Sequence, residues 1–262
     1  MNMIMVPILL GWFAAFFVNY MADVLPYTRN FTKPVCLQCQ EPISLRSYFL
    51  MQGASGCGHH RSLRTWVTQA LGVAAALYVW FNPPLKLGFA LGLILLIYLA
   101  VVLIIDIEHR LILHPTSLFG AALALILGTL LHGIAPTLIG GLAGFGIMFL
   151  LYLFGIQFTR VRAKKMTAKG IEQDEEEALG FGDVNLAGIL GLLLGWPVIW
   201  FGLLLGILAG GAISLLIVIY MLIARKYKDD AFMVFIPYGP YFILSSFALI
   251  YLPTWIKTII QP

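Results

Sequence analysis

Charged residues are scarce in this chain of 262 residues, which contains 16 Lys and Arg and 12 Asp and Glu, or 11% of the whole. A soluble domain carries about 25% charged residues, so this composition excludes an ordinary soluble protein. Hydrophobic residues make up 61% of the chain. Because lipid cannot satisfy backbone polar groups, apolar runs of about 20 residues cross a bilayer as helices. The fold class is therefore predicted to be an all-α polytopic membrane protein.

Several sequence signals of function are also missing. The chain has no Gly-x-Ser-x-Gly elbow, no His-Glu-x-x-His pair and no P-loop lysine, which are the patterns of common hydrolases and NTPases. Its basic residues are spread over four loops without an aromatic stripe, so no nucleic-acid partner is predicted. Before the first apolar run there is no basic segment, and no small-residue cleavage site follows it, so it is interpreted as a retained helix.

The apolar runs predict about eight transmembrane helices, and their order sets the orientation. They cover approximately residues 3–21, 66–82, 86–105, 115–132, 136–158, 183–197, 198–223 and 235–256. Placing the N-terminus outside puts all Lys and Arg except Lys86 and Lys257 in cytoplasmic loops, as the positive-inside rule requires. Any chemistry is therefore expected at the cytoplasmic face.

Two cytoplasmic loops divide this predicted order into domains. The first helix, residues 1–21, is followed by a loop at 22–65 that contains all three cysteines. The remaining residues, 66–262, form the second membrane domain. Its loop at 159–182 runs from basic to acidic residues with few apolar anchors, and it is predicted to be a solvated, mobile connector.

The cysteine loop has the spacing of a metal site: Cys36-x2-Cys39, seventeen intervening residues, then Cys57-x2-His60. Two ligand pairs on tight turns suit tetrahedral zinc, which binds three cysteines and one histidine as readily as four cysteines. Four protein ligands make the predicted Zn²⁺ structural, a zinc-knuckle-like clip for a loop too small to build its own core. The alternatives are reduced thiols without a metal and redox chemistry, and an odd cysteine count disfavours a disulfide framework.

Two aspartates lie at the predicted cytoplasmic edge of the membrane. Asp106 ends the third span and Asp183 opens the sixth, directly after Gly180 and Gly182. Because carboxylates inside a helix bundle are costly, they mark function by default. Two aspartates that share a site divide the work, one as a protonated acid and the other as the base that activates water. The glycines favour this interpretation, since they allow unusual backbone conformations and leave space for another chain.

The alternative interpretation is that each aspartate only ends a helix. Asp183 near a helix N-terminus is stabilised by the macrodipole. Asp106 lies close to Glu108, His109 and Arg110 and could be an ordinary solvated loop residue.

Taken together, these residues resemble those of bacterial type IV prepilin peptidases, GxGD-type aspartic proteases of the inner membrane. The resemblance runs from Gly11 to about Tyr241. It is carried by FFVNY with Asn19 and Pro26, by the Cys-x2-Cys-x2-Pro-Ile-Ser-x-Arg that begins at Cys36, by DIEH from Asp106, by GFGD ending at Asp183 and by FIPYGP from Phe235.

The resemblance implies removal of the positively charged leader of type IV prepilins or type II secretion pseudopilins, after a glycine and on the cytoplasmic side. Asp106 and Asp183 match the two catalytic aspartates, and Glu108 is the reserve for the first position. Such substrates have an apolar N-terminal helix, which implies a groove near the aspartates. FIPYGP, with Pro237, Gly239 and Pro240, is interpreted either as a lining of that groove or as a Pro-Gly turn that starts a helix.

Many members of this family also methylate the new N-terminus with S-adenosylmethionine, and the cysteine loop belongs to that activity. The sequence departs from the family pattern here. His60 replaces the fourth cysteine, and Gln69 stands where a glutamate is common. Asn185 stands where lysine often follows GxGD, and Leu113 where a proline often follows the first aspartate. These departures keep a metal clip possible and leave methylation open.

Two rival functions use the same aspartates. Another GxGD intramembrane protease, of the signal-peptide-peptidase or presenilin type, is expected to carry Tyr-Asp and Pro-Ala-Leu motifs, and neither is present. A proton-coupled transporter is expected to carry carboxylates near the middle of the bilayer in broken helices, and none lies deep in any predicted span. The sequence therefore favours the prepilin peptidase.

Overall fold

The structure is a computed structural model that describes residues 2–36, 39, 41–51, 61–167, 180–223 and 238–252. In these ranges the secondary structure consists of helices and one isolated antiparallel bridge, between Val35 and Pro42. This confirms the all-α fold class. The chain divides into two compact units, Met1–Thr116 and Ser117–Pro262, which are described one at a time.

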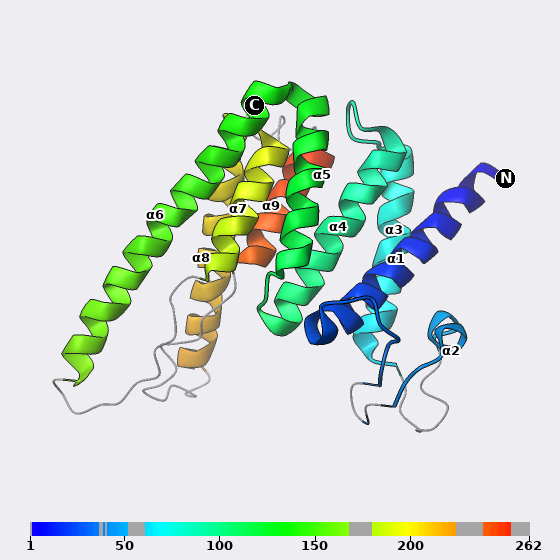
Figure 1. Cartoon of the computed structure of the whole chain (residues 1–262), viewed down its shortest axis with the longest axis horizontal. Coiled ribbons are helices and arrows are strands. Elements are labelled where there is room, and N and C mark those ends of the chain that lie inside the picture. Colours follow the sequence, from blue (N-terminus) through cyan, green and yellow to red (C-terminus); the bar gives the residue numbers. More distant parts are fainter. Residues whose placement is uncertain are drawn as a thin grey trace. The chain divides into compact units, whose positions relative to one another are not determined.

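The first unit packs three long helices together (Figure 1). Helix α1 spans Asn2–Thr28, α3 spans Leu63–Phe81 and α4 spans Gly88–His109, with the short α2, Leu45–Phe49, between α1 and α3. Small residues let α1 and α3 approach closely, because a Cβ added at Gly72 would lie 2.5 Å from the Cβ of Ala15. A hydrophobic core then joins α1 to α4 and the residues after it: Val18, Met21, Ala22, Leu25, Val101, Ile105 and Leu113.

The second unit is organised around the pair α6 and α7. Its helices are α5, His114–His132, which begins just before the boundary between the units, α6, Ile134–Thr167, α7, Phe181–Leu194, α8, Val198–Ile223, and α9, Gly239–Tyr251. Glycines hold α6 and α7 almost backbone to backbone. A Cβ added at Gly140 would lie 2.4 Å from the carbonyl oxygen of Gly191. A Cβ added at Gly191 would lie 2.2 Å from the carbonyl oxygen of Gly140. This close packing fixes the helix that carries Asp183.

Replacing Gly191 with alanine is expected to lower the free energy of unfolding by about 1–3 kcal/mol, because the new methyl group meets the rigid backbone of α6. Gly146→Ala is the matched control, since a Cβ at Gly146 has no atom within 4 Å and alanine favours a helix over glycine. Chemical denaturation of the purified protein in detergent measures both. Equal stability of the two variants would contradict the tight contact.

Each of the eight predicted spans overlaps a helix, but only five helices in the described ranges are long and apolar enough to cross a membrane. They lie at Ile4–Thr28, Gly88–His109, His114–His132, Ile134–Arg160 and Val198–Ile223. Helices α7 and α9 have 14 and 13 residues, too few for about 30 Å of hydrocarbon at 1.5 Å per residue. The chain is thus a multi-pass helical membrane protein, and the number eight stays a prediction.

Two predicted boundaries are wrong. The first helix continues past residue 21 to Thr28, so Asp23 belongs to a helix and not to a loop. The predicted connector at 159–182 begins as helix, because α6 continues to Thr167. Residues 168–179 of that connector lie outside the described part of the chain.

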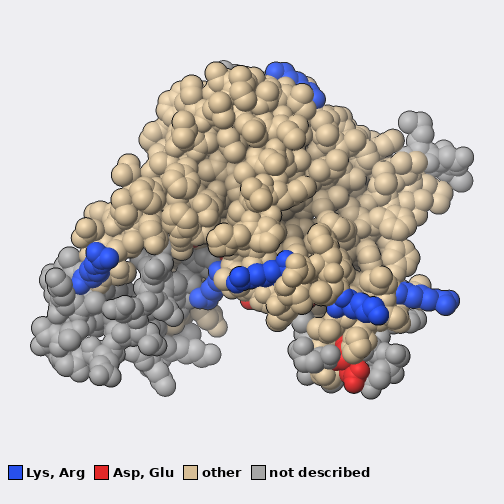
Figure 2. Space-filling view, in the orientation of Figure 1, with Lys and Arg blue, Asp and Glu red and all other residues tan. Residues whose placement is uncertain are grey.

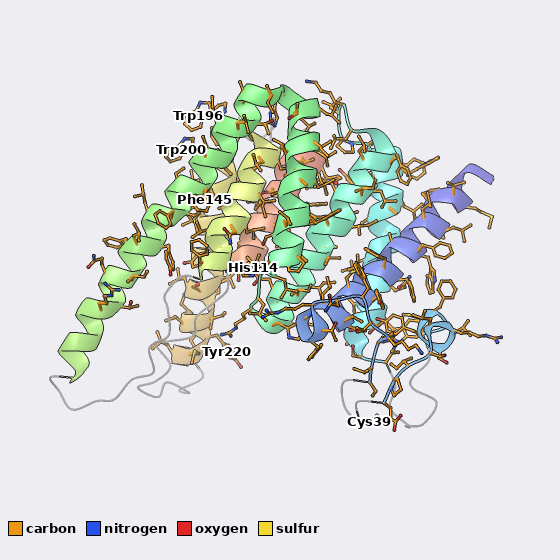
Figure 3. All side chains as sticks on the ribbon, viewed as in Figure 1. Cys39, His114, Phe145, Trp196, Trp200 and Tyr220 are labelled. Carbon is orange, nitrogen blue, oxygen red and sulfur yellow. The ribbon has the colours of Figure 1, made fainter. Side chains whose placement is uncertain are left out.

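The surface of the helices agrees with a lipid environment. On the face drawn in Figure 2, the flanks of the helices are almost free of blue and red atoms. Trp196 and Trp200, between the end of α7 and the first turn of α8, are 43% and 51% exposed, with ring centroids 6.2 Å apart (Figure 3). Tryptophans of this kind are enriched where a membrane meets water.

Candidate active site

Asp106 is a buried carboxyl group in the last turn of α4. Its side chain is 3% exposed, and its Oδ2 is buried without a hydrogen-bond partner among the residues that the structure describes. Just after it, α4 ends at Arg110, whose backbone is left-handed (φ 53°, ψ 39°) and whose N–H donates to the carbonyl of Asp106 at 2.8 Å. An orphaned buried oxygen costs about 1–3 kcal/mol. Such a group is typical of a functional site rather than of a solvated helix end.

The helix end that carries Asp106 is fixed by its neighbours in the first unit. The ring of His109 packs edge-on against Tyr27 of α1, with centroids 5.4 Å apart. Leu113, found in place of the family's proline, is 6% exposed and fills the core that contains Ile105. Leucine at this position therefore contributes to the packing next to Asp106.

Glu108, the reserve for the first catalytic position, has a different environment. Its side chain is 31% exposed, and Oε1 lies 3.0 Å from Nε of Arg64 on α3. An exposed carboxylate that already pairs with arginine is a poor candidate for proton transfer. The geometry favours Asp106 at the first position.

Asp183 lies in the first turn of α7 and is half-buried. Its backbone N–H donates to the carbonyl of Gly180 at 3.0 Å. The ring of Phe181 packs edge-on against Phe145 and Tyr152 of α6, at 6.5 and 5.7 Å between centroids. These contacts fix the start of α7, and the macrodipole stabilises a carboxylate there.

The two glycines before Asp183 contribute space more than backbone freedom. Gly180 has φ −75° and ψ 143°, an extended conformation that any residue adopts. A Cβ at Gly180 would meet no atom closer than 3.9 Å, and the residue is exposed. The expectation of an unusual backbone therefore does not hold at Gly180, while open space next to Asp183 does. Gly182 is half-buried within α7.

The described part of the FIPYGP motif, Tyr238 to Pro240, forms the start of a helix. Gly239 and Pro240 are buried and begin α9, with proline in its first turn. Tyr238 packs against Gly210 of α8, where a Cβ would lie 3.0 Å from its ring. This supports the interpretation as a Pro-Gly turn. Pro237 lies outside the described residues.

A groove of about 430 Å³ opens in the second unit between α5, α6 and α7. Its walls are mostly apolar and include Phe145 (Figure 3). Asn185 and Ser117 add polar groups, and the Oγ of Ser117 is buried without a partner. Asn185, which replaces the family's lysine, therefore lines an apolar groove. Asp183 and Asn185 are two positions apart on α7, which separates them by about 200° around the helix axis. Asp183 therefore lies on a different face of α7 from this groove.

The described residues on either side of the first half of the predicted zinc clip pair across a short antiparallel bridge. The N–H of Cys36 donates to the carbonyl of Glu41, and that of Ile43 donates to the carbonyl of Pro34, both at 2.8 Å. Cys36 packs against Ile43 and Tyr48, and Cys39 is exposed on the turn (Figure 3). Within the described ranges no three Cys, His, Asp or Glu residues are placed to hold a metal. Cys57 and His60, the other two predicted ligands, lie outside those ranges.

A buried polar cluster in the first unit was not predicted from the sequence. Asp23 of α1 is 5% exposed and accepts hydrogen bonds from the hydroxyl of Tyr48 at 2.5 Å, from Nη1 of Arg61 at 3.2 Å and from Nη2 of Arg64. Burial raises the pKa of Tyr48, and the charge of Asp23 raises it further. Its hydroxyl therefore stays protonated as a donor. The cluster ties α1, α2 and α3 together.

Asn19 and Gln69 extend this cluster between α1 and α3. The amide of Asn19 donates to the carbonyl of Thr65 at 3.2 Å, and its Oδ1 accepts from Arg64 at 3.3 Å. Gln69 is 2% exposed and donates to the carbonyl of Trp12 at 2.7 Å. An ionised glutamate could not make that donation. Gln69 is thus a satisfied structural residue in this chain.

Fold and site together define a polytopic helical membrane protein with a buried carboxyl at one helix end and a second carboxyl at the start of another. Residues 93–215, which include Asp106 and Asp183, match the type IV leader peptidase family. A prepilin leader peptidase/N-methyltransferase of Aeromonas hydrophila is 26% identical over 234 residues, which are 86% of this chain and 73% of that protein. No solved structure matches. The resemblance is confirmed: the match over residues 93–215 and the similarity to the Aeromonas hydrophila protein over most of the chain together support a prepilin peptidase.

Proposed function

We propose that this protein removes the leader peptide of type IV prepilins or type II secretion pseudopilins. The observation that carries the proposal is Asp106, a buried carboxyl with an orphaned oxygen inside the matched family region. With Asp183, it supplies an acid and a base for hydrolysis of a peptide bond without a covalent intermediate. In the proposed reaction the ionised carboxylate takes a proton from water as the water oxygen bonds to the peptide carbonyl carbon, and the other, protonated carboxyl gives its proton to the amine nitrogen as the C–N bond breaks.

The location follows from the charge distribution. With the N-terminus outside, the ends of α4 and α7 that carry the aspartates face the cytoplasm, where the loops with most Lys and Arg lie. We therefore place the enzyme in the bacterial inner membrane with its active site at the cytoplasmic face. Asp106 is in the last turn of its helix and Asp183 in the first turn of its own. This disfavours the transporter, which needs carboxylates near mid-bilayer.

A cleavage assay tests this function. The purified protein in lipid nanodiscs is incubated with a full-length prepilin that keeps its leader and its apolar helix. Mass spectrometry is expected to show one cut, after the glycine that precedes the mature N-terminus. An intact prepilin, or cuts scattered along the helix, would refute the proposal.

Methylation of the new N-terminus is the second part of the proposal, and it rests on the similarity to the Aeromonas hydrophila protein, whose name includes N-methyltransferase. Where bound, S-adenosylmethionine supplies an electrophilic methyl group. In the same assay, adding S-adenosylmethionine is expected to increase the mass of the processed pilin by one methyl group. A product without that increase would limit the protein to cleavage.

A structural zinc ion is proposed for the cysteine loop, held by Cys36, Cys39, Cys57 and His60. The antiparallel bridge beside Cys36 and the turn at Cys39 are compatible with the paired turns of zinc sites. Metal analysis is expected to find zinc in the wild type and much less of it in Cys57→Ser, with Ser55→Ala as the control. No zinc in the wild type would remove the clip.

A further inference from the structure

The buried cluster around Asp23 contains the guanidinium group of Arg61, and only some of its N–H donors make hydrogen bonds to the described residues. The cluster lies outside the matched region at 93–215, so the peptidase chemistry does not account for it. Arg61 is 9% exposed and donates from Nη1 to Oδ2 of Asp23 at 3.2 Å. Its Nε and Nη2 are both buried, and no residue in the described part of the chain accepts a hydrogen bond from them. Burying such donors without partners is costly.

The two unpartnered atoms form one edge of the guanidinium group. Nε–H and the inner N–H of Nη2 point the same way and match the two oxygens of a carboxylate, which they bind with two parallel hydrogen bonds. The guanidinium carbon lies 3.7 Å from the centroid of the Tyr48 ring. The Tyr48 ring therefore covers one face of the guanidinium group and fixes the orientation of its plane. The N–H groups of the edge lie in that plane, so the ring does not accept hydrogen bonds from them.

Asp23 cannot satisfy this edge. Its Oδ2 already accepts from Tyr48 and Arg61, and its Oδ1 accepts from Arg64. Among the described residues, Glu108 is the other carboxylate paired with the cluster; it contacts Arg64 and is 31% exposed. Two largely buried guanidinium groups thus share one fully buried carboxylate. An additional anion is favoured on charge as well as on geometry.

We propose that Arg61 binds the carboxylate of a small amino-acid ligand through Nε and Nη2, with the Tyr48 ring as a platform. The methyl-transfer part of the proposed function, on which this inference rests, supplies a ligand of this class, because S-adenosylmethionine carries an α-carboxylate. Arg61 is a binding residue in this assignment and takes no part in leader cleavage. Asp23 and Tyr48 hold its guanidinium group in place.

Calorimetric titration of the purified protein with S-adenosylhomocysteine tests the site without any turnover. Arg61→Lys keeps a positive charge beside Asp23 but loses the two-pronged edge, and it is expected to bind this probe about 10- to 100-fold more weakly. Arg46→Lys is the matched control, because Arg46 is exposed on α2. 5′-Methylthioadenosine, which has the nucleoside and thioether but no amino-acid group, is expected to bind weakly and equally to wild type and Arg61→Lys.

The comparison of the two probes on the wild type needs no variant, so it decides the matter even if Arg61→Lys does not fold. Equal binding of both probes, equal binding of S-adenosylhomocysteine by wild type and Arg61→Lys, or no binding by the wild type would each overturn the site. Displacement by an equal concentration of inorganic phosphate would also overturn it, since the site would then bind oxyanions such as lipid phosphates. Titrations in the Asp183→Asn background need no peptidase activity, which keeps this test separate from that of leader cleavage.

Discussion

Asp106→Asn and Asp183→Asn are each expected to lower the rate of leader cleavage by about 10²- to 10⁴-fold, the contribution of a general acid or base. Asparagine keeps the size and polarity of the side chain but can neither take up nor release a proton at neutral pH. Asp106 is buried and Asp183 half-buried, so the near-isosteric change is expected to leave the fold intact. The rate is measured with a prepilin in nanodiscs, and folding is followed by thermal unfolding.

Glu108→Gln is the control for this prediction. It lies two residues after Asp106 on α4 and loses only a partly exposed ion pair with Arg64, worth about 0.2–1 kcal/mol. Cleavage is expected to change by less than about threefold, since 1.4 kcal/mol corresponds to a factor of ten. A large loss in Glu108→Gln with full activity of Asp106→Asn would move the catalytic role to Glu108. Full activity of Asp183→Asn would refute the proposed pair.

Asp23→Ala is expected to lower the free energy of unfolding by about 3–5 kcal/mol, as removing one partner of a buried ion pair does. The carboxylate accepts from Tyr48, Arg61 and Arg64, and it is 5% exposed. Without it, two guanidinium groups of the first unit are left close together without their shared counter-charge. Chemical denaturation in detergent, read from the fluorescence of the tryptophans, measures the loss.

Tyr48→Phe is the matched control, because it removes one neutral donor and leaves both ion pairs in place. It is expected to cost about 1–2 kcal/mol. A loss in Asp23→Ala no larger than that of Tyr48→Phe would mean that the arginines find other partners or water. Asp23 would then not be the centre of the cluster.

Much of the fold could be predicted from local sequence, and the errors have physical causes. Apolar runs marked the five helices of the described ranges that are long enough to span a membrane, and also the shorter apolar helices α7 and α9, because burial in lipid depends on composition over about 20 residues. The end of α1 was placed at residue 21 because Asp23 interrupts the apolar run. Asn19 and Asp23 are four residues apart and share a face of a helix, and that spacing was the one signal that could have shown both as inward-facing.

The candidate site was predicted in part. Asp106 and Asp183 stand out locally, as carboxylates beside apolar runs and, for Asp183, after two glycines. The preference for Asp106 over Glu108 needed side-chain environments, because both residues lie in the same short DIEH motif. Arg61 and Arg64 were counted only as loop charges that set orientation. Their common partner Asp23 is about 40 residues away, a distance that no local pattern bridges.

The sequence by itself determined that the chain is a helical membrane protein and where its apolar helices lie, and it singled out Asp106 and Asp183 as the proposed catalytic pair. These properties depend on composition and on motifs, which are local. Only the tertiary structure decided that α6 and α7 meet through Gly140 and Gly191, that the Oδ2 of Asp106 is buried without a partner among the described residues, and that two buried nitrogen atoms of Arg61 are likewise unsatisfied beside Tyr48. Each of these depends on which atoms of distant segments come within a few ångströms of one another, and packing alone fixes that.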